Sequence, residues 1–178
     1  MALSAASIAA AMLAKLQAAF PVPGHPPATA TALTALAEGM VDGMATVLTP
    51  DGGIGIRLKN ATGTGSVRGS VVRASLTADD SFDLEPAGGD DAIGVVYTDG
   101  VAGGQYATVV IGGIADVLLQ NGETATRGYW VRVSASVAGR AAMEATPNPM
   151  THWTEIGHCI ESKASGTNVL ARCVLHFN

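Results

Sequence analysis

Two stretches of the chain share one strand–turn–strand pattern of apolar residues and glycines. Residues 93–112 read IGVVYTDGVAGGQYATVVIG, and residues 156–175 read IGHCIESKASGTNVLARCVL. β-branched and aromatic residues are typical of strands, and the glycines between them permit the positive φ angles of turns. Each stretch is therefore predicted to form a β-hairpin. The two align without a gap, with Val110 on Cys173.

A shorter match precedes each hairpin. Residues 68–75 read RGSVVRAS and residues 127–134 read RGYWVRVS, so Arg-Gly, Val, Arg and Ser recur in order. Two matches in the same order predict one unit of about sixty residues written twice, over residues 54–118 and 119–177. Two copies are too few for a solenoid. We expect a pseudo-symmetric β-domain in which each half covers the apolar face of the other.

Alternation also marks the start of the predicted β-domain, where Ile54, Ile56 and Leu58 alternate with glycine, arginine and lysine. This period of two predicts a strand that buries one face. Residues 77–92 are acidic and rich in glycine, without apolar periodicity. They are predicted to be a surface loop around a short strand at residues 82–84.

Helical spacing marks the N-terminal part of the chain. Residues 3–19 are rich in alanine, the best helix former, and residues 31–49 carry apolar side chains at three- and four-residue spacings. A proline-rich linker, residues 21–27, separates these two predicted helices, and a Pro-Asp-Gly-Gly cluster ends the second. We expect an α-helical arm over residues 1–50, followed by a β-domain over residues 51–178.

Interface candidates come from both parts. Four lie on the second predicted helix: Leu33, Leu36, Met40 and Met44. The spacing leaves open whether that helix lies on the β-domain or associates with the first helix or with other subunits. Three more are large side chains in a chain of small residues: Tyr129, Trp130 and Trp153. Because buried aromatics dominate interface energetics, we predict that at least one tryptophan packs at a subunit boundary.

Composition limits the classes of function. Only 14% of the residues are charged, 22 are glycine, and the formal net charge is −5 with scattered basic residues. A nucleic-acid binder usually has a basic face, so nucleic acid is not an expected partner. Lys15 interrupts the apolar N-terminal run, so we expect neither a signal peptide nor a membrane span. Few charges and many small residues favour an assembly subunit over a freely diffusing enzyme.

The residues with reactive side chains form no recognisable catalytic pattern. His152, His158 and Cys159 do not have the spacing of a zinc site, and the acidic pairs near Asp80 and Asp91 lack the calcium-loop pattern. We therefore expect no catalytic residue, metal or cofactor. If the last hairpin turns near its glycine, Cys159 and Cys173 face each other, as a cross-strand disulfide or as two buried thiols.

Several short motifs resemble tailed-phage capsid decoration (cement) proteins. They are Lys-Asn-Ala-Thr-Gly at residues 59–63, Arg-Gly-x-x-Val at residues 68–72, Ile-Gly-Val-Val at residues 93–96, and Val-Val-Ile-x-Gly at residues 109–113. The resemblance implies a mainly β fold, a compact β-barrel or β-clip-like domain. It also implies a capsid-surface protein of the virion that is in the host cytoplasm during assembly. Its partners would be the major capsid protein and copies of itself, as a dimer or trimer.

Two alternatives stay open. The same β-domain suits a tail, baseplate or fibre-base adaptor protein of the virion. A surface carbohydrate-binding module or enzyme would instead need an exposed aromatic platform, or a pocket joining His152, His158 and the acidic loop.

Overall fold

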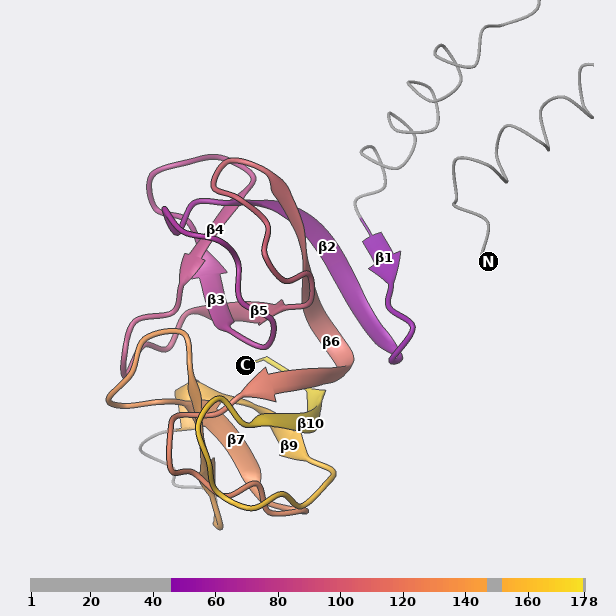
Figure 1. Ribbon diagram of the computed structural model, residues 1–178, viewed down its shortest axis with the longest axis vertical. Coiled ribbons are helices and arrows are strands. Elements are labelled where there is room, and N and C mark those ends of the chain that lie inside the picture. Colours follow the sequence, from indigo (N-terminus) through magenta and orange to yellow (C-terminus); the bar gives the residue numbers. More distant parts are fainter. Residues whose placement is uncertain (1–45, 147–151, 178) are drawn as a thin grey trace, which may run out of the picture. The chain divides into compact units, whose positions relative to one another are not determined.

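The computed structural model describes residues 46–146 and 152–177, which belong to one compact unit beginning at Thr46. These residues form a single mixed sheet of ten strands, with one short 3₁₀ helix, η1, at His152–Thr154. The strands are β1 (Thr46–Leu48), β2 (Gly53–Asn60), β3 (Val71–Ala74), β4 (Ser81–Leu84), β5 (Ala92–Val96), β6 (Tyr106–Leu118), β7 (Trp130–Val133), β8 (Ala141–Glu144), β9 (Glu155–Cys159) and β10 (Leu170–Leu175). The described part is therefore mainly β (Figure 1).

The N-terminal strands close into a five-stranded barrel, here called the first ring. Its order is β2-β4-β3-β5-β6, and the pairing of β2 with β6 closes it. All of its pairings are antiparallel except that of β2 with β4, where Lys59 lies opposite Ser81. The interior holds fully or nearly fully buried apolar side chains: Val72, Phe82, Val96, Ala107 and Val109. A closed barrel leaves no free strand edge.

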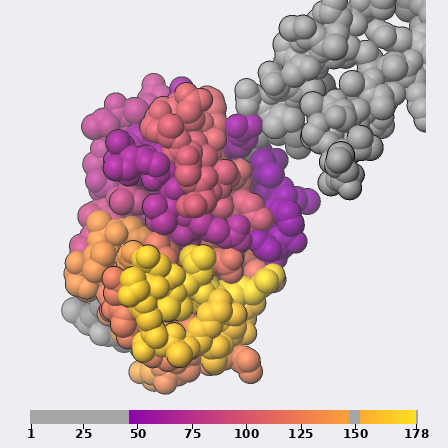
Figure 2. Space-filling model, viewed as in Figure 1, coloured from indigo at the N-terminus to yellow at the C-terminus, as the bar shows by residue number. Residues whose placement is uncertain are grey.

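Strand β6 continues beyond this barrel and begins a second ring. Its C-terminal part pairs with β10, and the order then runs β10-β9-β7-β8. A bridge from Leu119, directly after β6, to Ala141 of β8 completes this ring. Figure 1 shows β6 passing from the upper group of strands to the lower one, and Figure 2 shows the two groups as adjoining parts of the surface. One long strand therefore belongs to both rings.

The two rings are paired in the same way. In the first, Val71 lies opposite Val95 and Val95 lies opposite Val110. The corresponding pairs in the second are Trp130 with His158 and His158 with Val174. The ladders of β3 with β5 and of β7 with β9 each shift register at the same point, before an arginine. The predicted duplication requires equivalent strand pairings in the two halves, as found here. The duplication itself stays a prediction.

The gapless alignment of the two hairpins is wrong by one residue. It places Val110 on Cys173, whereas the pairings place Val110 in the position of Val174. The second hairpin therefore carries one extra residue in the loop between its strands. A loop absorbs such an insertion at little cost because its backbone is at the surface.

Other sequence predictions are corrected by strand pairing. Residues 46–48, assigned to a helix ending at Thr49, form β1, which pairs with β2 through a tight turn. Gly53 N donates to the Oγ1 of Thr49 in that turn, at 2.8 Å. Ile54 is expected to be buried but is 45% exposed, whereas Ile56 and Leu58 of the same strand are half-buried. The two predicted helices otherwise lie outside the described residues, as does most of the predicted arm.

Arg68 joins the two rings at their junction. Its Nη2 lies 3.0 Å from a carboxylate oxygen of Asp51, in the β1–β2 turn, and 2.9 Å from one of Asp116, on β6. The guanidinium also lies over the ring of Tyr97, 4.5 Å from its centroid. These contacts connect the turn before β2, the end of β5 and the part of β6 that enters the second ring.

Cys159 and Cys173 lie directly opposite each other on β9 and β10, as the hairpin pattern predicts, and both are buried free thiols. A hydrogen bond from the Cys173 thiol lowers the pKa of Cys159 to about 7. The same contact raises the pKa of Cys173.

Burial rather than ionisation should decide how these thiols react, because a reagent must reach the sulfur. We expect both to stay unmodified by iodoacetamide at pH 8 while the protein is folded, and both to react after unfolding in urea. Mass spectrometry under non-reducing conditions counts the added groups. A native protein that lacks two titratable thiols after unfolding would instead indicate a disulfide.

Candidate functional site

The outer side of β7, β9 and β10 carries the candidate site. On the first ring, the corresponding side of β3, β5 and β6 carries three valines with 0% exposure: Val71, Val95 and Val110. These valines belong to the apolar cluster that fills the second ring, so the second ring covers them. The positions that correspond to them on the second ring are half-buried or exposed: Trp130, His158 and Val174. Each half is expected to cover the apolar face of the other. In the structure, the second ring covers this face of the first ring, but the first ring does not cover the corresponding face of the second.

We call this surface the Trp130 face, and it consists of Trp130, His152, Trp153, His158, Val174 and His176. The Trp130 ring packs against the His158 ring with centroids 4.0 Å apart. His152 and His176 approach the same indole edge-on, at 6.4 and 5.9 Å. The Nε2 of His176 lies 2.9 Å from the Nδ1 of His158, so one imidazole donates a proton that the other accepts. Strand β7 therefore places one indole among three imidazoles.

A buried carboxylate lies beside this face. Glu155 opens β9, its side chain is 0% exposed, and one oxygen lies 2.6 Å from the Nδ1 of His152. The second oxygen has no hydrogen-bond partner among the described residues. Burial and the neighbouring His158 lower the pKa of His176, which keeps that imidazole neutral at pH 7. His152 supplies a positive charge beside Glu155 only when its imidazole is protonated.

The structure brings together two of the predicted interface residues. Trp130 and Trp153 both contact the ring of His152, with centroids 6.4 Å away in each case. Trp153 is 67% exposed and Tyr129 is 36% exposed. Tyr129 precedes β7 and makes no ring contact with the described part of this face. The helix candidates Leu33, Leu36, Met40 and Met44 lie outside the described residues.

Sequence reasoning found neither His176, which belongs to this face, nor Glu155, which lies beside it. His176 follows β10 and reaches His158 across the hairpin, and Glu155 reaches His152 within the η1–β9 segment. The signal that points to the face itself is a comparison of the two copies. Trp130 and His158 replace valines that are buried in the first copy, and such a replacement indicates a changed environment.

The described residues contain no group of three or more metal-ligating side chains that could hold an ion. His158 and Cys159 are successive residues of β9, so their side chains point to opposite sides of the strand. Cys159 faces the interior with Cys173, whereas His158 faces Trp130. The three residues considered as zinc ligands, His152, His158 and Cys159, are therefore not brought together.

No helix in the described ranges has the length and apolar character needed to cross a bilayer.

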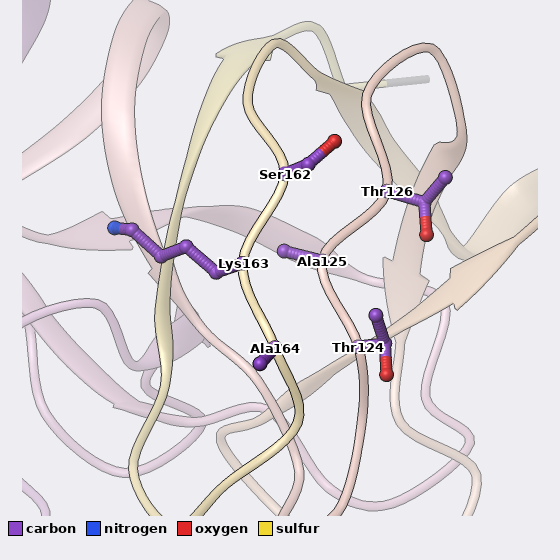
Figure 3. Close-up of a pocket in the computed structure, with 6 residues that line it drawn as sticks. All are labelled: Thr124, Ala125, Thr126, Ser162, Lys163 and Ala164. Carbon is purple, nitrogen blue, oxygen red and sulfur yellow. The ribbon is translucent and has the colours of Figure 1, made fainter.

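A shallow depression lies elsewhere on the second ring, between the loops before β7 and after β9 (Figure 3). It is lined by Thr124, Ala125, Thr126, Ser162, Lys163 and Ala164. Figure 3 shows the Lys163 side chain running away from the three hydroxyl groups. Its Nζ lies 2.6 Å from a carboxylate oxygen of Glu161 and donates to the carbonyl of Leu170. The depression therefore has no convergent charged groups.

The acidic loop contains a carboxyl pair that the sequence did not reveal. Glu85 directly follows β4, is 0% exposed, and has no donor to either carboxylate oxygen among the described residues. The carboxyl group of Asp91 lies nearby. Burial and Asp91 raise the pKa of Glu85 to about 7. The nearby Arg73 forms an ion pair with Asp91 at 3.6 Å.

Comparisons with known proteins add little to this description. No family model matches the chain, and no curated protein matches it. A solved structure with a partial likeness is the N base of the head fibre protein gp8.5 of bacteriophage phi29. It is 17% identical, with a TM-score of 0.45, over 68% of this chain and 92% of that one. This score does not establish a shared fold, and the fold assignment rests on this chain's own strand pairing.

Proposed function

We propose that this chain is a structural protein of a tailed-phage virion. In the finer form of the proposal, it binds the outside of the capsid and stabilises it by bridging major capsid subunits. The proposal starts from the decoration-protein resemblance, whose motifs lie in residues 59–113. One of its residues, Asn60, is buried and donates to the carbonyls of Thr64 and Val101, so it orders the loop after β2.

The observation that carries the proposal is the exposed Trp130 face on a continuous sheet. Trp130 and His158 lie opposite each other on paired strands, so their side chains lose little entropy when a partner covers them. Aromatic residues are the typical anchors of protein interfaces. A shell binder of this kind needs only modest affinity for each contact, since many copies act on one particle.

We further propose that the protein is not an enzyme. The ionisable groups near the Trp130 face are engaged with one another: His158 with His176, and Glu155 with His152. Glu85 is fully buried, so its carboxyl group is not accessible to a substrate. These arrangements suit a docking surface better than a reaction centre.

The test uses particles that lack this protein. Purified protein added to such particles is expected to co-sediment with the heads and to raise the temperature at which the heads release their DNA. Binding to isolated tails but not to heads would favour the tail or baseplate alternative and contradict the capsid proposal. Quenching of tryptophan fluorescence by soluble cell-wall saccharides, without binding to particles, would favour the carbohydrate-binding alternative.

A further inference from the structure

The two cysteines of the second ring occupy one cross-strand position. Cys159 on β9 and Cys173 on β10 are direct partners in the antiparallel register. At the adjacent position of this ladder, the N–H of Ile160 donates to the carbonyl of Arg172 at 2.9 Å. Hydrogen-bonded and non-hydrogen-bonded pairs alternate along an antiparallel ladder, so the two cysteines form a non-hydrogen-bonded pair.

A non-hydrogen-bonded pair brings its two side chains closest together. Its Cα atoms lie about 4.5 Å apart, and a disulfide spans Cα separations of about 4.4–6.8 Å. The thiols of Cys159 and Cys173 already lie within hydrogen-bond reach of each other. The two strands therefore need little adjustment to carry a bond between these sulfurs.

The surroundings leave each thiol a single partner. Cys159 is 1% exposed and Cys173 is 0% exposed, and both belong to the apolar cluster that fills the second ring. On its other side, Cys173 lies opposite Ala115 of β6. The sequence contains only these two cysteines, so neither has an alternative partner within the chain.

We propose that Cys159 and Cys173 are a reversible redox pair, which closes into a cross-strand disulfide when a peroxide reaches the folded protein. Hydrogen peroxide is close to water in size, whereas burial excludes larger reagents such as iodoacetamide. The pair is therefore selective for small oxidants.

The reaction converts two thiols and one peroxide into one disulfide and two waters. The Cys159 sulfur attacks one oxygen of hydrogen peroxide, the O–O bond breaks, and the released hydroxide takes the Cys159 proton as water. The Cys173 sulfur then attacks the sulfenic sulfur of Cys159, and the S–O bond breaks. The leaving hydroxide takes the Cys173 proton, so the pair loses two electrons. The lowered pKa of Cys159, about 7, favours it as the first nucleophile.

The bond would tie together two strands of the Trp130 face. His158 precedes Cys159 on β9, and Val174 follows Cys173 on β10. The closed loop also restricts the unfolded chain, which raises the resistance of the second ring to unfolding. Under the proposed function, the chain is made in a reducing cytoplasm and acts in particles released into oxidising surroundings, where disulfides persist. That setting rests on the proposed function, whereas the chemistry of the pair does not.

The test starts from the full chain purified with reductant and then desalted. After treatment with a small molar excess of hydrogen peroxide at pH 7.5, the protein is unfolded in urea with iodoacetamide. No thiol is expected to be alkylated, and non-reducing peptide mapping is expected to show Cys159 linked to Cys173. The urea midpoint of the treated protein is expected to rise, and dithiothreitol is expected to reverse both changes. Two alkylated thiols after this treatment, or disulfides between chains, would overturn the proposal.

Two variants separate the roles of the thiols. Cys173→Ala lacks the second thiol, so peroxide is expected to leave a sulfenic acid on Cys159 that dimedone traps, with no rise of the urea midpoint. Cys159→Ala keeps only the thiol with the raised pKa, which is expected to react at least tenfold more slowly. Circular dichroism checks that both variants fold. Equal rates for the two variants would contradict the assignment of Cys159 as the first nucleophile.

Discussion

Gly69→Ala is expected to lower the free energy of unfolding by about 2–4 kcal/mol. Gly69 has a φ of 84° and lies at the junction of the two rings. A Cβ there would lie 2.4 Å from a methyl carbon of Leu170 and 2.8 Å from the backbone nitrogen of Leu118. The Leu118 N–H also donates to the carbonyl of Gly69, so the backbone has little room to move.

Gly128→Ala is the matched control for this prediction. Gly128 has the same φ of 84° in the corresponding turn of the second ring, but a Cβ there would meet no atom within 4 Å. Only the backbone cost of a left-handed alanine remains, about 1 kcal/mol. Urea unfolding of both variants at one pH measures the difference. Equal losses of unfolding free energy in the two variants would mean that Gly69 is no more closely packed than Gly128.

Glu85→Gln is expected to stabilise the protein at pH 8 by up to about 3 kcal/mol and to have little effect near pH 4.5. Burial, with the nearby Asp91 carboxyl, raises the pKa of Glu85 to about 7 from an ordinary value of 4.5. A carboxyl whose pKa is raised by folding contributes its stability below pH 4.5. That contribution is lost as the pH rises from 4.5 to 7, because the unfolded state releases the Glu85 proton at a lower pH than the folded state does.

Glutamine keeps the shape of the side chain, carries no charge, and offers Asp91 an N–H donor. The measurement is the urea midpoint of wild type and variant at pH 4.5, 6 and 8. Asp90→Asn removes a charge from the same loop at an exposed position, and its effect is expected to be small and independent of pH in this range. A Glu85→Gln variant that is less stable than the wild type at pH 8 would contradict the prediction that the ionised Glu85 carboxylate destabilises the folded state.

The hairpins and the Arg-Gly turns could be predicted from the sequence because their signals are local. Glycine and β-branched residues within about twenty positions determine a turn and its two strands. Closure of the rings could not be predicted in this way. It depends on the parallel pairing of Lys59 with Ser81 and on the bridge from Leu119 to Ala141, which join segments separated by other strands.

Strand β1 was missed for a related reason. Residues 46–48 continue a helical spacing of apolar residues, and only their pairing with β2 makes them a strand. The candidate site was predictable in part: Trp130 and Trp153 stand out by size in this chain. Glu155, His176 and the Glu85–Asp91 pair do not stand out, because burial and cross-strand neighbours define them rather than spacing.

The most direct test of the proposed function is a cryo-electron microscopy reconstruction of purified phage particles that contain this chain. The account predicts density for the two-ring sheet on the outer surface of the shell, bridging neighbouring major capsid subunits. Density confined to the tail or its base, with none on the shell, would contradict it.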